Sequence, residues 1–158
     1  MAIVISDAGP LIALARIDAL FILQKLFSTI QIPEAVYQEC IAKEAVDSQR
    51  IQQAIDEGWI NPVSVTVKQS FPVSLGAGEI EAMQLALDNE ATLLIMDDRL
   101  ARRQAMVLEL NYIGIIRVLY LAEQKLLINN AEVLVQQMVK TGYRVSLQLL
   151  KTLKTEDL

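Results

Sequence analysis

Short apolar runs rich in β-branched residues alternate along the chain with longer stretches whose apolar positions recur every three to four residues. The runs predict strands buried on both faces, and the recurring positions predict helices with one buried side. Strands are expected over residues 2–6, 30–32, 59–67, 92–96 and 112–116. Pro62 interrupts the third of them, which favours an edge strand or an extended segment there. Helices are expected over residues 10–27 (continuing past Asp18), 33–41, 46–57, 79–89, 99–110, 118–125, 130–141 and 146–153.

Alternation of strands and helices favours right-handed crossovers and a parallel sheet covered on both faces. We therefore expect an α/β fold, a three-layer α/β/α domain with a mainly parallel central sheet. A length of 158 residues fits one domain over residues 1–158, with residues 129–158 as its helical C-terminal extension. Apolar side chains of this extension either close the core or form the face of a homodimer, which is the expected state. They are Leu147, Leu149, Leu150 and Leu153.

The amino-acid composition excludes several kinds of catalytic and metal-binding site. The chain has no histidine, which excludes catalytic triads and metal sites that need one, and its single cysteine, Cys40, cannot form an intrachain disulfide. A net charge of −5 argues against a surface of general positive potential for duplex DNA. No apolar run approaches the roughly 18 residues of a membrane span, and no secretory signal opens the chain, so we expect a cytoplasmic protein without membrane partners.

Acidic residues follow two of the predicted strands. Asp7 comes directly after the first strand, and Asp97 and Asp98 come directly after the fourth. Carboxyl ends of parallel strands meet at one edge of a sheet, where ligands bind. Clustered carboxylates repel one another, and Mg²⁺ or Mn²⁺ is the cation that such oxygens prefer. The alternative is structural, with Asp7 as a turn residue and Asp98 as a helix N-cap.

Two helices supply further acidic candidates. Glu39 lies on the helix after the second strand, beside Cys40, and Glu79 lies in the first turn after Gly78. Glu81 is two residues beyond Glu79 and therefore projects about 200° around the helix from it. Only one of the two can face a given site, and Glu79 is the preferred ligand. Its alternative role is a favourable contact with the helix dipole.

Four segments, in this order and spacing, resemble the PIN-domain family. That family consists mostly of metal-dependent ribonucleases and includes the VapC-type toxins of toxin–antitoxin modules; the chain is most similar to a prokaryotic branch of predicted nucleic-acid-binding PIN proteins. The segments are residues 4–12 (VISDAGPLI), Ile32-Pro33 with Val36 and Glu39, residues 75–82 (LGAGEIEA) and residues 94–102 (LIMDDRLAR).

The resemblance implies a metal-dependent endoribonuclease that hydrolyses RNA phosphodiesters without a protein nucleophile. Its metal ligands and catalytic acids would be Asp7, Glu39, Glu79 and Asp98, with Asp97 as the alternative to Asp98, and its cofactor would be Mg²⁺ or Mn²⁺. Arg99 and Arg102 lie beside the last acids and would contact substrate phosphates, whereas a solvated helix face is favoured for Arg103. The implied partners are RNA and a cognate antitoxin.

Three positions depart from the family pattern, and one of them is Arg117, which replaces a residue that is usually small. Met96 stands where many PIN proteins have a threonine, and Ile115 follows Gly114 where the branch commonly has a second threonine. These departures support an alternative, a weakly active or inactive PIN-fold module that binds nucleic acid or protein. A phosphoryl-transfer receiver domain is less favoured, because Asp7 is a single acid and no lysine follows the last strand. Gly76-Ala77-Gly78 lacks the third glycine of a dinucleotide-binding loop.

Overall fold

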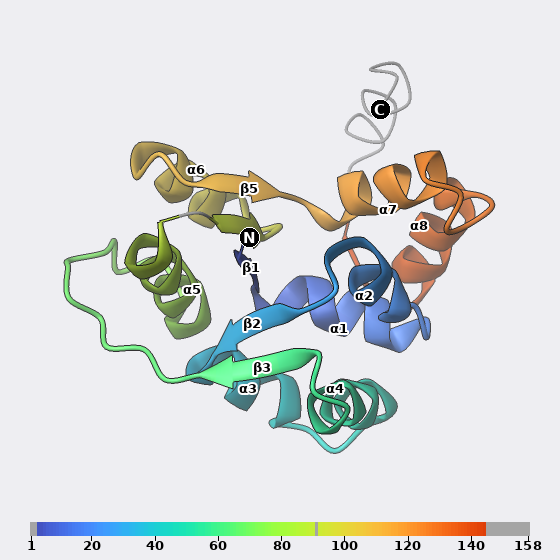
Figure 1. The fold of residues 1–158 in the computed structure, drawn as a ribbon, viewed down its shortest axis with the longest axis horizontal. Helices are drawn as coiled ribbons and strands as arrows, with labels where there is room; N and C mark the ends of the chain where they lie inside the picture. The colour runs from blue at the N-terminus through green and yellow to red at the C-terminus, as the bar shows by residue number, and fades with distance from the viewer. Residues whose placement is uncertain (1–2, 91, 145–158) are drawn as a thin grey trace.

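The centre of the protein is a parallel β-sheet with the strand order β3-β2-β1-β4-β5 (Figure 1). This arrangement comes from a computed structural model that describes residues 3–90 and 92–144. Within these ranges all four strand pairings are parallel, which confirms the expected α/β class and sheet type. The strands are β1 (Ile3–Ser6), β2 (Ile30–Pro33), β3 (Ile60–Val63), β4 (Thr92–Ile95) and β5 (Asn111–Ile113).

Helices cover both faces of the sheet, as expected for three layers. They are α1 (Ala8–Arg16), α2 (Phe21–Phe27), α3 (Glu34–Ile41), α4 (Val46–Asp56), α5 (Ala77–Asn89), α6 (Arg99–Val107), α7 (Ile115–Gln124) and α8 (Ala131–Lys140). Alternate residues of the central strands enter two separate cores. Val4 and Ile95 pack in a core with α1–α4, α7 and α8, whereas Ile5 and Leu94 pack in a second core with α5 and α6.

Several boundaries differ from the sequence-based expectation. The predicted strand over residues 112–116 ends at Ile113, because Gly114 is the N-cap of α7 and Ile115 begins that helix. The predicted helix over residues 10–27 is two helices, since the chain turns after Arg16 and Asp18 adopts a left-handed backbone (φ 56°). The helix expected to reach residue 110 ends at Val107, and Glu109 has a positive φ of 59°.

The C-terminal helix α8 packs against α7 and α1. It agrees with the helix expected over residues 130–141, and its N-cap Asn130 accepts a hydrogen bond from the backbone N–H of Val133. The further helix expected over residues 146–153, with its four leucines and the homodimer face, lies outside the described residues. Among the helices described, none combines the length and the apolar character that a membrane span requires.

Candidate active site

A pocket of about 500 Å³ lies at the carboxyl ends of β1 and β4. All five acids proposed from the sequence line it, although they come from four separate segments of the chain. We call it the acidic pocket. Its lining residues are Asp7, Gly9, Pro10, Glu39, Gly76, Glu79, Asp97, Asp98, Tyr143 and Arg144.

Asp7 lies deepest of these acids, with 8% of its surface exposed. Its backbone N–H continues the sheet by donating to the carbonyl of Ile95 (3.0 Å), which fixes Asp7 beside the end of β4. The pKa of Asp7 is raised from 3.8 to about 7, mainly by burial, and the Ala8 N–H offsets part of this rise. The charges of Glu79, Glu39 and Asp97 contribute to the same rise. Acids from all three of the other segments therefore influence the pKa of Asp7.

Glu39 lies on α3 and Glu79 on α5, and Gly78 of α5 lies beside Glu39. A Cβ atom at Gly78 would lie 3.2 Å from Glu39 Oε1 and 3.5 Å from Asp7 Oδ1, so the missing side chain lets α5 come close to both acids. Burial is the main cause that raises the pKa of each glutamate, and the charge of Asp98 also raises that of Glu79. Glu79 Oε1 accepts a hydrogen bond from the Gly76 N–H (2.9 Å), which fixes its position at the start of α5.

Glu81 points away from the acidic pocket. Its Oε1 accepts a hydrogen bond from the backbone N–H of Ala35 (3.1 Å), in the first turn of α3. This contact ties α5 to α3 and satisfies a helix N–H that has no partner within its own helix. The placement agrees with the preference for Glu79 over Glu81, while the role of Glu79 as a metal ligand stays a prediction.

Asp97 combines a structural contact with a free oxygen atom. Its Oδ1 accepts a hydrogen bond from the Ile115 N–H (2.9 Å) and lies 3.4 Å from Nη2 of Arg102. Its Oδ2 is buried and accepts no hydrogen bond of ordinary geometry from any residue described. Burial raises the pKa of Asp97, and the Ile115 N–H, the nearby Tyr143 hydroxyl and Arg102 each offset part of the rise.

Asp98 is exposed and caps α6. Its Oδ2 accepts a hydrogen bond from the Ala101 N–H (2.9 Å), so the structural role considered from the sequence is present. The same carboxylate lies near enough to Glu79 to raise the pKa of Glu79. Because Asp97 and Asp98 both line the acidic pocket, their placement leaves either of them able to contribute a ligand.

The arginines near the acidic pocket have different surroundings. Nε of Arg102 donates to the carbonyl of Met96 (2.8 Å), and its guanidinium lies 5.8 Å from the centre of the Tyr112 ring, so much of this side chain is engaged within the fold. Arg99 and Arg103 are exposed on α6 and lie outside the lining of the pocket. Phosphate binding by Arg99 or Arg102 stays a prediction.

Sequence reasoning missed two residues of the pocket wall, Tyr143 and Arg144. Both follow α8 and reach the acids through the path of the chain. No motif surrounds them in the sequence; only their closeness to Gly142, which permits a sharp turn after a helix, hints at a return towards the core. The fold was needed to find them.

The donor set of the pocket fits a hard divalent cation. It offers carboxylate oxygens, which Mg²⁺ and Mn²⁺ prefer. Burial is the main cause that raises the pKa values of Asp7, Glu39 and Glu79, and the charges of neighbouring acids add to the rise for Asp7 and Glu79. The buried Oδ2 of Asp97 is a further oxygen without a partner among the described residues. Cys40 is unsuited to metal binding, because burial raises the pKa of its thiol to about 12. In the ranges described, no three acidic or cysteine side chains are close enough together to hold one ion. An ion held by one or two of the carboxylates would complete its coordination with water.

Comparison with known families agrees with this geometry. A family model described as a PIN domain (DUF3368) matches residues 3–156, which is nearly the whole chain. No curated protein matches the chain closely enough to count as a relative. PIN domains are in general nucleases that act on nucleic acids and typically use divalent metal ions. The chain therefore belongs to the PIN-domain family, and this membership indicates a function of the nuclease type.

Proposed function

We propose that the protein is a Mg²⁺- or Mn²⁺-dependent endoribonuclease. The observation that carries the proposal is the gathering of Asp7, Glu39, Glu79, Asp97 and Asp98 around one pocket at the carboxyl edge of the sheet. Carboxylates that share a partly dry site raise the free energy of folding unless a cation accompanies them. A cation bound there attracts a phosphodiester, which the acids alone would repel.

A bound divalent ion would activate a water molecule and stabilise negative charge on the attacked phosphate. Asp7, Glu39 and Glu79, with Asp97 or Asp98, are the residues that would hold it. The chain has no histidine, so the proton released in hydrolysis would pass to a carboxylate of the pocket, such as Glu39 or Glu79, or to a second water molecule.

The departures from the family pattern at Met96 and Ile115 do not alter the pocket wall. Met96 is fully buried in the core beneath α5 and α6, and Ile115 is fully buried in the core on the opposite face of the sheet. Neither lines the acidic pocket. Their placement supports an active nuclease over an inactive binding module, because no pocket side chain is lost through either replacement.

Cleavage of single-stranded RNA tests the proposal. Labelled RNAs should be cut by the purified protein with Mn²⁺ or Mg²⁺ and left intact with a chelator. Asp7→Asn and Glu79→Gln should each abolish cutting, while Glu44→Gln, the same kind of change on an exposed residue outside the pocket, should leave it unchanged. RNA that is bound but never cut would establish the binding-module alternative. Cutting that persists in Asp7→Asn would point to a contaminating nuclease.

A narrower part of the proposal is that the protein is the toxin of a toxin–antitoxin module. It rests on the resemblance to VapC-type toxins. Expression of the protein should then arrest growth, and Asp7→Asn should relieve the arrest. Co-expression of a small protein encoded beside this gene should also relieve it. Normal growth during expression of an active enzyme would exclude the toxin role and leave the nuclease intact.

A further inference from the structure

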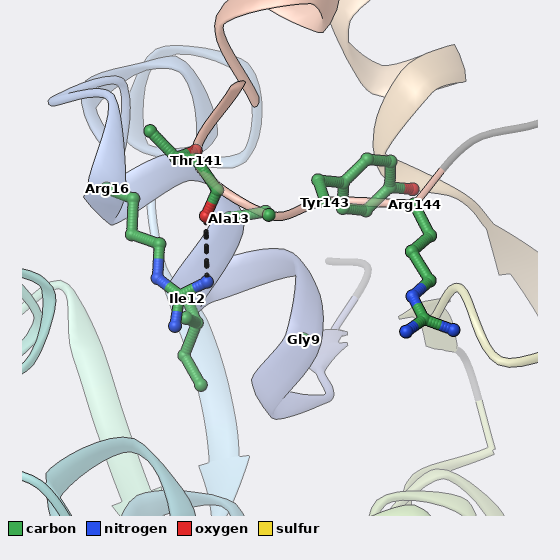
Figure 2. A pocket seen from close by; sticks show the side chains of 8 residues that line it. Gly9, Ile12, Ala13, Arg16, Thr141, Tyr143 and Arg144 are labelled. Carbon is green, nitrogen blue, oxygen red and sulfur yellow. Dashed lines mark hydrogen bonds between the residues drawn. The ribbon is translucent and has the colours of Figure 1, made fainter. Parts of the chain in front are cut away.

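A second pocket, of about 220 Å³, adjoins the acidic pocket (Figure 2). We call it the arginine pocket. The two pockets share Gly9, Tyr143 and Arg144, so they are neighbours on the surface of the protein. The arginine pocket is lined by Gly9, Ile12, Ala13, Arg16, Thr141, Gly142, Tyr143 and Arg144.

The two pockets differ in charge. Five acids and Arg144 line the acidic pocket, whereas the described residues that line the arginine pocket include two arginines and no acid. Arg144 is exposed, and no residue described forms an ion pair with it. Ile12 and Ala13 of α1, with the ring of Tyr143, provide apolar surface between the two arginines (Figure 2). This combination suits a ligand with an anionic group and a flat apolar part.

The wall of the arginine pocket is held in place by the end of α8. Gly142 adopts a left-handed backbone (φ 107°), and the Tyr143 N–H donates to the carbonyl of Met138 (3.0 Å), which turns the chain back towards α1. Arg16 secures this turn, since its Nη1 donates to the carbonyl of Thr141 (3.2 Å; Figure 2). Arg16 also lies 3.7 Å from Asp47, so Arg144 is the arginine that is more available to a ligand.

We propose that the arginine pocket holds the nucleotide next to the cleaved phosphodiester bond of a single-stranded RNA. The inference rests on the proposed nuclease function and adds a binding site to it. With the scissile phosphate at the acidic pocket, the neighbouring phosphate lies near Arg144 and the attached base packs against Ile12, Ala13 and Tyr143. A base can enter only when it is free of a duplex, which selects single strands.

The test uses one RNA whose cut position has been mapped. Two abasic versions of it are prepared, one without the base just before the cut and one without the base just after it. For the unmodified protein, one of these abasic RNAs should show about a tenfold lower kcat/KM than the intact RNA, mainly through KM. Gly9→Leu should fill the arginine pocket without harming the fold, because a Cβ atom at Gly9 meets no atom within 4 Å. In that variant, the intact and abasic RNAs should be cut equally.

Comparing intact with abasic RNA distinguishes an effect on the arginine pocket from an effect on the acidic pocket, although Gly9 lines both. A leucine that merely obstructed the acidic pocket would slow cleavage of intact and abasic RNA by the same factor, and the abasic effect would remain. That result, or equal cleavage of both RNAs by the unmodified protein, would overturn the proposal while the nuclease function stands.

The phosphate contact is tested separately by salt dependence. Arg144→Gln should weaken RNA binding about tenfold and lower the slope of log affinity against log salt by about one. Lys25→Gln, an equal change of charge on an exposed residue of α2, should leave both quantities unchanged. If no RNA is cut under any condition, the proposed function fails. Binding of intact and abasic RNA in the presence of a chelator then still tests the arginine pocket. Weaker binding of the abasic RNA supports the proposal, and equal binding contradicts it.

Discussion

The fold raises the pKa of Asp7 far above that of an exposed aspartate. In the folded chain its pKa is about 7, compared with 3.8 for an exposed aspartate, because it is buried among other acids. Between these two pH values the folded state binds more protons than the unfolded state. The contribution of Asp7 to stability is therefore full below about pH 4 and is lost as the pH rises towards 7.

We predict that Asp7→Asn stabilises the metal-free protein increasingly as the pH rises. The gain should be small near pH 4, reach a few kcal/mol near pH 7 and change little above it, because asparagine cannot ionise. Urea unfolding of both proteins with a chelator, across this pH range, measures the difference. A difference that does not depend on pH would show that Asp7 titrates in its ordinary range.

Glu79 and Glu81 are close in sequence, but the structure gives them separate tasks. We predict that Glu79→Gln abolishes RNA cleavage, because it removes a charge from the acidic pocket. Glu81→Gln should retain cleavage, since its amide oxygen can still accept the hydrogen bond from the Ala35 N–H. Glu81→Ala should cost about 1 kcal/mol of stability through loss of that bond. Cleavage assays and urea unfolding of the three variants check these outcomes, and loss of activity in Glu81→Gln would contradict them.

At the scale of elements, Arg102 of α6 lies beside Gly114 at the start of α7. A Cβ atom there would overlap the guanidinium of Arg102, and it would lie 3.1 Å from Asp97 Oδ1. We predict that Gly114→Ala destabilises the protein by about 1–3 kcal/mol, because Arg102 must leave Asp97. In an Arg102→Ala background the same change should cost much less, since the overlap is gone. Equal costs in the two backgrounds, measured by urea unfolding, would place the strain elsewhere.

The start of α7 also shows why part of the fold could not be predicted from the sequence. Buried strands such as β1 and β4 are predictable, because continuous apolar runs bounded by Asp7 and Asp97 carry a local signal. The pair Ile115-Ile116 also reads as a strand, but both residues are helical. The N–H of Ile115 finds its acceptor on Asp97, far away in sequence, and a local pattern cannot contain that contact.

The candidate site is predictable to a similar degree. The positions of Asp7, Asp97 and Asp98 follow from strand ends, and the spacing of Glu79 and Glu81 on a helix separates these two residues correctly. That Tyr143 and Arg144 close the pocket depends on the packing of α8 against α1 and on the turn at Gly142. Such contacts between distant segments become visible only when the chain is folded.

For the molecule as a whole, we predict that Mn²⁺ or Mg²⁺ raises the melting temperature. An ion that binds only the folded state stabilises it by about 2.7 kcal/mol at a hundredfold excess over Kd, roughly 5–10 °C for a chain of this size. Asp7→Asn should lose most of this shift, whereas Glu44→Gln should retain it. Scanning calorimetry at several ion concentrations provides the measurement. A melting temperature that is unchanged in millimolar Mn²⁺ would contradict a metal site.

The order of the strands in the sheet also bears on how such a protein is synthesised. The central strand β1 is made first, yet one of its neighbours, β4, ends at Ile95, and the last acids follow it. A nascent chain therefore cannot assemble the acidic pocket until β4 and the acids after it have left the ribosome. A fragment that ends before β4 contains Asp7, Glu39 and Glu79 but lacks the strand that holds Asp7 beside Asp97 and Asp98. Such a fragment is expected to form no acidic pocket.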